Sequence, residues 1–210
     1  MKLAVLSESP ADEAFVQTIT TSVLGVATEF PASYQFRSRG WGSLPKLLPS
    51  VILELYYATD LDGLLVVADS NGTEPHELNH TPETAKDCRF CKLRLAADER
   101  MARLRPVPGR IPLRLAIGLA IPAIEAWYLC GKDPTVTEAA WVNGRREGKL
   151  PYTRAELKVR AYSTDRPSLD EEVATAISQS QRHAKDALTS LRQWFPAGCG
   201  SMLGSMEGWH

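Results

Sequence analysis

The sequence predicts an α/β fold in which a mainly parallel sheet is flanked by helices and followed by a helical C-terminal part. Short apolar, β-prone segments alternate with segments that have the helical repeat, which is typical of strands joined by right-handed crossovers. Residues 63–68 are continuously apolar, as expected of a strand buried on both faces of a parallel sheet. The length of 210 residues fits one domain with an added piece.

The chain begins with the pattern of a strand, a turn and a helix. Residues 2–6 form a short apolar run, and from Pro10 the apolar side chains follow the helical period. Ser9 is a favourable N-cap residue, and Pro10 fits the first helical position. We interpret Asp12 and Glu13 as side chains that complement the positive end of the helix dipole.

The remaining elements continue the alternation and then become helical. In order, we expect a strand at 31–37, a basic glycine-containing loop at 37–42, a helix at 44–57, the central strand at 63–68, a helix at 82–104, a strand at 114–119, and helices at 122–129, 135–141, 153–161 and 169–194. This order predicts an α/β core at 1–130 and a helical extension at 131–210 that packs on the core.

Composition and charge exclude several classes of protein. Hydrophobic residues make up 44% of the chain and charged residues 23%, which excludes intrinsic disorder and collagen. The net charge is −1, but residues 1–88 hold 5 basic and 12 acidic residues, whereas residues 89–210 hold 19 basic and 13 acidic. This division fits an acidic site beside a groove lined by Arg and Lys, and solvated helix faces would give the same division.

No membrane segment is expected. The longest apolar stretch, residues 113–127, is interrupted by charged residues and is shorter than the roughly 20 residues of a spanning helix. The start of the chain turns polar too soon for a secretory signal, so we expect a cytosolic protein. Four cysteines are too few and too unevenly placed for a disulfide scaffold, so we interpret them as buried thiols or metal ligands: Cys88, Cys91, Cys130 and Cys199.

Acidic residues follow three of the expected strands. Glu8 comes after the first strand, Asp69 and then Asn71 come after the central one, and Glu125 lies four residues beyond Ile121. Ligands of parallel sheets bind beyond the carboxyl ends of the strands, so these side chains can converge at one edge. Their oxygens are hard ligands of the kind that Mg²⁺ or Mn²⁺ prefers, and such an ion activates water for phosphoryl transfer. The alternative is that the acids only cap strand ends and helix starts.

The segments around these acids carry a resemblance. Leu-Ser-Glu-Ser-Pro at Glu8, Val-Val-Ala-Asp-Ser-Asn-Gly at Asp69 and Ile-Pro-Ala-Ile-Glu-Ala-Trp at Glu125 resemble TOPRIM-like proteins over residues 1–130. TOPRIM domains, which have a Rossmann-like fold, occur in topoisomerases, primases and OLD nucleases. They hold Mg²⁺ with a glutamate after the first strand and an Asp-x-Asp after a later one. The resemblance therefore implies that Glu8 and Asp69 bind Mg²⁺.

The Glu-Ala-Trp segment is further similar to a small bacterial TOPRIM-like family that is often encoded beside ATPases in defence loci. That resemblance implies that Glu125 is a further metal-site acid and that Arg39–Gly42 matches the Arg-Gly motif of the family. The chain departs from the pattern at Asn71, which stands where the motif has a second aspartate. An asparagine offers an oxygen without the negative charge, so we expect a lower affinity for the metal.

A His-x3-His-x7-Cys-x2-Cys pattern follows the central strand. Two imidazoles and two thiolates are a usual tetrahedral set for structural Zn²⁺, and the pattern comprises His76, His80, Cys88 and Cys91. We expect a zinc-binding insertion at 72–92, although the order is not that of a standard zinc finger. The alternative is that the cysteines lie near a helix start and the histidines lie in a solvated loop.

Basic residues supply candidate contacts to nucleic acid. Residues 89–114 and 145–166 are rich in Arg and Lys, which fits either phosphate binding or a solvated helix surface. The proposed nucleic-acid-binding residues are Arg37, Arg39, Trp41, which could stack on a base, and Lys132, which could neutralise a phosphoryl transition state. Trp127, Trp141 and Trp194 are expected in the core.

Two functions are consistent with these features. The first is a Mg²⁺-dependent nuclease of TOPRIM-like type, acting on DNA or RNA in anti-phage defence, with Glu8, Asp69 and Glu125 as catalytic residues. The second is a catalytically degenerate TOPRIM-like subunit that binds a partner ATPase or nucleic acid, which Asn71 favours. The sequence has no Gly-x4-Gly-Lys-Ser/Thr loop, so a partner would have to supply any ATP-driven step. A homodimer is left open.

Overall fold

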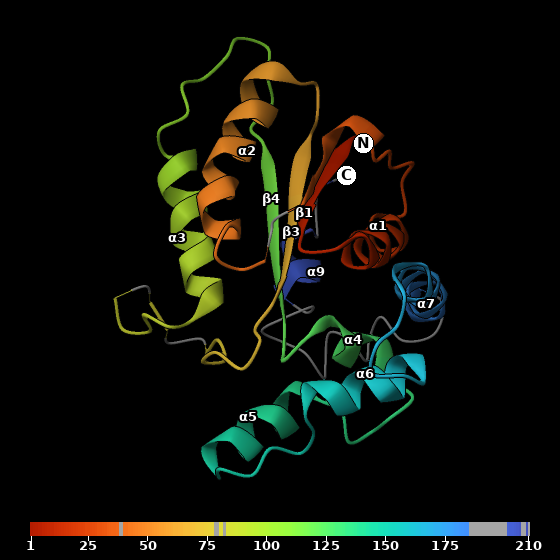
Figure 1. The fold of residues 1–210 in the computed structure, drawn as a ribbon. Helices are drawn as coiled ribbons and strands as arrows, with labels where there is room; N and C mark the ends of the chain where they lie inside the picture. The colour runs from red at the N-terminus through yellow and green to blue at the C-terminus, as the bar shows by residue number, and fades with distance from the viewer. Residues whose placement is uncertain (38–39, 78–79, 82, 185–200, 207–208, 210) are drawn as a thin grey trace.

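The computed structural model describes residues 1–37, 40–77, 80–81, 83–184, 201–206 and 209. Within them, four strands form one parallel sheet in the order β2-β1-β3-β4 (Figure 1). The strands are β1 (Leu3–Ser7), β2 (Gln35–Arg37), β3 (Gly63–Asp69) and β4 (Arg114–Ala120). The predicted α/β class, with a mainly parallel sheet flanked by helices, is confirmed.

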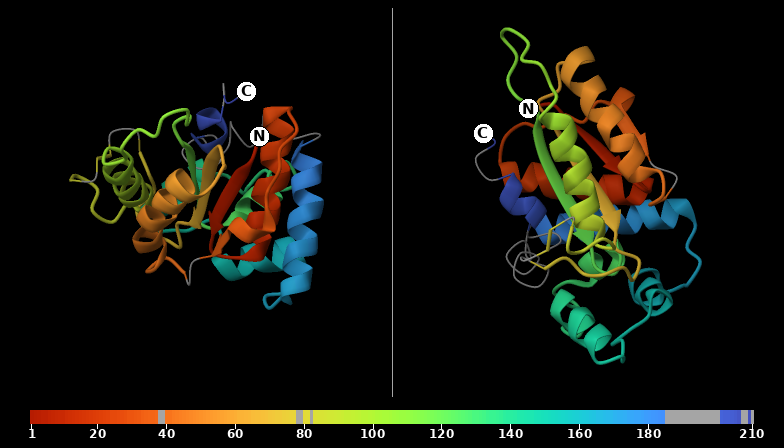
Figure 2. Two further views of the ribbon diagram at one scale, coloured as in Figure 1. Left: turned by 90° about the horizontal axis from the view of Figure 1, so that it is seen from above. Right: turned by 90° about the vertical axis from the view of Figure 1, so that its left-hand side faces the viewer.

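Helices cover both faces of the sheet (Figures 1 and 2). One face carries α1 (Pro10–Leu24), with α7 (Leu169–Arg182) packed along it, and the other carries α2 (Leu44–Ala58) beside α3 (Arg89–Met101). A short helix, α9 (Ser201–Ser205), packs against β4. Because both faces are covered, every residue of β1 and β3 is buried, which explains their continuously apolar sequences.

Three helices lie beyond the carboxyl ends of the strands (Figure 1): α4 (Ile124–Leu129), α5 (Glu138–Arg146) and α6 (Arg154–Tyr162). Of these, α6 packs against both α4 and α7. The C-terminal part of the chain therefore closes over the edge of the sheet at which parallel strands usually present their ligand-binding residues.

Capping residues fix where the helices begin. The Ser9 side chain accepts a hydrogen bond from the backbone N–H of Asp12 at 3.2 Å, which confirms Ser9 as the cap of α1. Both α6 and α7 begin with a capping box, in which the side chain of a Ser or Thr and that of a Glu three residues later each bond the other's backbone N–H. The pairs are Thr153 with Glu156 and Ser168 with Glu171.

One glycine permits close packing on β4. A Cβ atom at Gly118 would lie 3.0 Å from the Sδ atom of Met202 and 3.2 Å from the Trp127 ring. The glycine therefore allows α9 and the indole of Trp127 to approach the sheet closely. Trp127 and Tyr128 also pack on Phe15 of α1, with ring centroids 6.1 Å and 5.1 Å from that of Phe15.

Several predicted boundaries differ from the observed ones. The helix predicted at 82–104 begins at Arg89, because Cys88 is its extended N-cap residue. The helix predicted at 135–141 begins after Thr137, whose side chain caps the Ala140 N–H. The strand predicted at 31–37 shortens to β2, because a 3-10 turn, Ala32–Tyr34, precedes it. Residues 185–194 of the last predicted helix lie outside the described residues.

In the described parts of the chain, no helix combines the length and the apolar composition needed to cross a membrane.

Candidate functional site

Four acidic side chains meet at the carboxyl edge of the sheet. Glu8 follows β1, Asp12 lies in the first turn of α1, Asp69 ends β3, and Glu125 lies in the first turn of α4. Together they line one cavity of about 250 Å³, which we call the carboxylate cleft. Other residues that line the cleft include Ser9, Arg154, Lys158, Tyr162 and Glu172.

The structure therefore brings together the three acids expected from the sequence, and adds Asp12 and the ion-paired Glu172. Asp12 was assigned to the helix dipole alone, but its side chain is buried beside the other acids. The sequence did contain an indication of this position. Asp12 lies only four residues after Glu8, in the first turn of the helix that follows β1. An acid in the first turn of a helix is so common that the pattern alone does not identify a site.

Burial and mutual repulsion disfavour the ionised forms of these acids. The pKa of Asp12 is raised to about 7, mainly by burial; the charges of Glu125 and Glu8 add to this rise, and hydrogen bonding to Ser9 opposes it. The pKa of Asp69 is raised well above its usual range by burial and then by the charges of Asp12 and Glu125. Burial also raises the pKa values of Glu8 and Glu125.

Two carboxylate oxygens in the cleft have no hydrogen-bond partner among the described residues. They are Oε1 of Glu8 and Oε2 of Glu125, and the Glu125 residue is only 3% exposed. In contrast, Asp69 is well bonded, because its Oδ1 accepts from the Ile124 N–H at 2.9 Å and its Oδ2 accepts from Arg154 at 2.7 Å. Buried polar atoms without partners are unfavourable, so the two free oxygens mark where a ligand would be stabilised.

Two arginines border the acids. The guanidinium of Arg154 donates to Oδ2 of Asp69 and to Oδ1 of Asn71. Arg89, at the start of α3, donates to the backbone carbonyl of Asp69 at 2.6 Å, and its guanidinium lies 4.6 Å from the centroid of the Trp41 ring. Both arginines also lower the pKa of Glu8 against the larger effect of burial. The cleft therefore combines acids with cations that can hold an anionic substrate.

Sequence reasoning placed these cations only within broad basic segments. Arg89 and Arg154 lie 20 and 85 residues after Asp69, so no local spacing connects them to it. Lys158 follows Arg154 by one helical turn and forms an ion pair with Glu172 at 3.4 Å. Only the folded structure shows that α6 brings Arg154 and Lys158 into the cleft, and that Arg89 of α3 borders it at the Asp69 carbonyl.

The structure does not bring Asn71 into the carboxylate cleft. Its backbone adopts a left-handed conformation, with φ of 47°, and its exposed side chain lines a neighbouring pocket instead. Asn71 contacts the cleft only through Arg154, which binds both Asn71 and Asp69. Asn71 is therefore not among the residues that line the carboxylate cleft.

The proposed nucleic-acid-binding residues lie in different surroundings. Arg37 donates to Oε2 of Glu13 at 3.0 Å, and Trp41 packs on Arg89. Lys132 lies in the turn after α4, where its backbone N–H donates to the Leu129 carbonyl, and it does not line the carboxylate cleft. Arg39 lies outside the described residues.

A second cluster lies at the start of α3. The ligand atoms of four side chains lie within 4.8 Å of one another, so that they could hold a metal ion, and we call them the His–Cys cluster: His76, His80, Cys88 and Cys91. Nδ1 of His76 is 3.6 Å from Sγ of Cys88 and 3.5 Å from Sγ of Cys91. Both cysteines are buried, and burial raises the pKa of Cys91 to about 12. Thiols that are buried together beside imidazoles are the arrangement expected of a metal site.

The carboxylates do not form such a compact group within the described residues. They surround a cavity, whereas the His–Cys ligand atoms already converge on one point. The two sites are adjacent in the sequence and in space, because Arg89 follows Cys88 directly and reaches the carbonyl of Asp69.

Comparisons with protein-family models, with curated proteins and with solved structures find no match for this chain.

Proposed function

We propose that the carboxylate cleft hydrolyses phosphodiester bonds in DNA or RNA with Mg²⁺ or Mn²⁺, which makes the protein a nuclease. The observation that carries this proposal is the convergence of four acids in one cleft, with buried oxygens of Glu8 and Glu125 that have no partner among the described residues. The chain resembles a small TOPRIM-like family that is often encoded beside ATPases in defence loci. This resemblance supports a role in defence against phage.

The donor set fits a hard divalent cation. Carboxylate oxygens are the ligands that Mg²⁺ and Mn²⁺ prefer, and a cation would relieve the repulsion that raises the pKa values of these acids. Glu8, Asp69 and Glu125 would hold the ion, and the buried Asp12 adds negative charge beside them. When bound, the ion activates water and stabilises the charge of the phosphoryl transition state.

The cations of the cleft bind the substrate in this proposal. Arg154 has a planar guanidinium that suits the oxygens of a phosphate, and it is about half exposed. Arg89 is fixed by its bond to the Asp69 carbonyl and by Trp41. The two arginines therefore orient a phosphodiester across the acids. Arg37, which pairs with Glu13, and Trp41, which packs on Arg89, would add contacts to the nucleic acid.

A binding subunit is the second candidate function, because Arg154 pairs with Asp69 and Asn71 does not enter the cleft. In such a subunit the guanidinium takes the place of the cation, and the protein would contribute binding to nucleic acid or to a partner ATPase rather than cleavage.

We further propose that the metal of the His–Cys cluster is Zn²⁺ in a structural role. Two thiolates and two imidazoles suit Zn²⁺ and leave no position for a reacting water in a tetrahedral shell. The cluster joins residues 76–80 to the start of α3, so the ion would fix the helix that carries Arg89.

The test compares cleavage of single-stranded and double-stranded DNA and RNA by the full chain with Mg²⁺ or Mn²⁺. Wild type and Glu54→Gln, an exposed acid of α2, should cleave, whereas Glu8→Gln and Asp69→Asn should not. Calorimetric titration with Mn²⁺ should show binding that both cleft variants lose. Nucleic-acid binding without cleavage and without Mn²⁺ binding would favour the binding subunit. Cleavage that persists in both cleft variants would refute the proposed site.

A further inference from the structure

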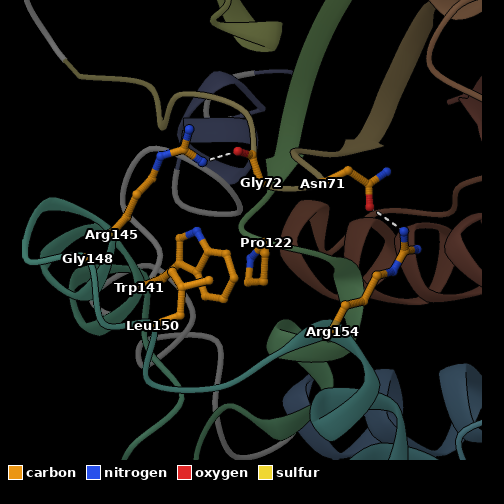
Figure 3. Close-up of a pocket in the computed structure, with 8 residues that line it drawn as sticks. All are labelled: Asn71, Gly72, Pro122, Trp141, Arg145, Gly148, Leu150 and Arg154. Carbon is orange, nitrogen blue, oxygen red and sulfur yellow. Dashed lines mark hydrogen bonds between the residues drawn. The ribbon is translucent and has the colours of Figure 1, made fainter.

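A second cavity, of about 500 Å³, lies beside the carboxylate cleft (Figure 3). We call it the side pocket, and its lining residues come from the turn after β3, from Pro122, and from α5 and the segment that leads to α6. They are Asn71, Gly72, Pro122, Trp141, Arg145, Gly148, Leu150 and Arg154. Arg154 lines both cavities, so a ligand in the side pocket would lie next to the acids.

The polar groups of the side pocket favour an anionic ligand. Among the described residues, its lining includes two arginines and no acid. Arg145 is held against the turn after β3 by hydrogen bonds to the carbonyls of Gly72 and Thr73, and Arg154 is held by Asn71 and Asp69. Because both guanidinium groups are fixed by the protein, an anion would be bound without ordering two flexible side chains.

One buried donor in the side pocket has no partner among the described residues. The Trp141 residue is only 4% exposed, and its indole Nε1 is buried without a hydrogen-bond partner. Figure 3 shows the ring nitrogen on the side of Arg145 and Gly72. The ring itself packs on Tyr152, with centroids 5.4 Å apart, so it is held in place. A buried N–H donor of this kind is stabilised by a ligand that offers an acceptor.

Three apolar residues contribute to the lining of the side pocket, of which Pro122 and Trp141 are buried and Leu150 is exposed. Leu150 is 47% exposed, and Pro122 lies beside the Trp141 ring (Figure 3). Flat apolar surfaces next to a hydrogen-bond donor suit a heteroaromatic ring, and the adjacent arginines suit a phosphate. The volume is sufficient for one nucleotide.

We infer that the side pocket binds one nucleotide of the substrate strand, next to the phosphodiester held in the carboxylate cleft. The base enters the pocket between Trp141 and Leu150 and accepts a hydrogen bond from the indole N–H. Its phosphate binds Arg154, which connects the pocket to the acids. This inference rests on the proposed function and names its substrate class as an unpaired nucleotide, because a base in the pocket cannot be paired within a duplex.

The test is calorimetric titration of the full chain with the four nucleoside monophosphates and with inorganic phosphate, without Mg²⁺ or Mn²⁺, so that cleavage does not interfere. Leu150→Glu should weaken nucleotide binding about tenfold or more, because it places a negative charge at the rim. Trp141→Phe keeps an aromatic ring but removes the N–H, and should weaken binding about three- to tenfold. The matched control is Leu95→Glu, at a side chain of similar exposure, 40%, on α3.

The inference predicts that wild type and Leu95→Glu bind nucleotides equally and more tightly than phosphate. Equal binding by Leu150→Glu and Leu95→Glu, or equal binding of phosphate and nucleotides, would refute it. The two proposals fail separately. If Asp69→Asn abolishes cleavage but Leu150→Glu leaves nucleotide binding unchanged, only the side pocket is refuted. If Asp69→Asn still cleaves but Leu150→Glu weakens nucleotide binding, only the nuclease is refuted.

Discussion

Replacing Asp12 by asparagine should stabilise the protein at neutral and alkaline pH when no divalent cation is present in the cleft. Folding raises the pKa of Asp12 from 3.8 to about 7, mainly because the side chain is buried. An acid with a raised pKa favours the folded state only while it is protonated. The unfolded state releases its proton at a lower pH, so stability is lost as the pH rises from about 4 to about 7.

The size of the effect follows from the shift. With these pKa values, ionisation costs the folded state about 2 kcal/mol at pH 5 and about 4 kcal/mol at pH 8. Asparagine carries no charge and can still bond Ser9, so the advantage of Asp12→Asn in free energy of unfolding should grow by about 2 to 3 kcal/mol between these pH values.

Urea denaturation at pH 5 and pH 8, in buffer without Mg²⁺ or Mn²⁺, measures this difference. Asp165→Asn, at an exposed acid, serves as the control and should show no comparable change. Addition of Mg²⁺ at pH 8 should stabilise wild type more than Asp12→Asn, because the cation offsets the charge of the acids. A gain from Asp12→Asn that is the same at pH 5 and pH 8 would show that the burial of its charge is not costly.

Three other substitutions test the remaining parts of the two sites. Cys88→Ser should lose one equivalent of bound zinc, measured by mass spectrometry of the metal content, whereas Cys130→Ser, at another buried thiol, should keep it. If both variants keep the zinc, the His–Cys cluster is not the metal site. Arg154→Gln should weaken the binding of single-stranded DNA, measured by fluorescence anisotropy, at least about tenfold. Thermal stability should change little, because the side chain is half exposed, and unchanged DNA binding would exclude the guanidinium as a phosphate ligand. Thr153→Ala removes the capping box of α6 and should lower the free energy of unfolding by about 1 kcal/mol. In a calorimetric scan the melting temperature should fall by about 2 to 4 °C, and an unchanged melting temperature would mean that packing alone holds α6.

The sequence was sufficient to predict the fold class because its central strands, β1 and β3, are buried on both faces. The apolar run at β3 and the alternation with helices identify a parallel sheet without any knowledge of contacts. Boundaries were less predictable where capping decided them. Thr137 and Cys88 set the starts of α5 and α3, and periodicity does not indicate which of several adjacent residues will act as the cap.

Three acids of the candidate site were predictable from the sequence, whereas Asp12 and the cations were not. Glu8, Asp69 and Glu125 share a position relative to their strands, so the topology rule brings them together. Arg154 shares no such relation with them, since it reaches the cleft only through the packing of α6 on α4 and α7. The side pocket was missed for the same reason. Trp141 was correctly expected to be buried, but its unpartnered N–H is visible only in the folded structure.

The order in which the chain is synthesised also sets the order in which the cleft is completed. Its clustered acids Glu8, Asp12, Asp69 and Glu125 are all present once residue 125 has been made, whereas Arg154 and Lys158 arrive later. Until α6 has left the ribosome and docked, a growing chain contains these four acids without these two cations. Protein synthesis itself therefore separates these four acids from Arg154 and Lys158, whereas Arg89, which borders the cleft, is made before Glu125.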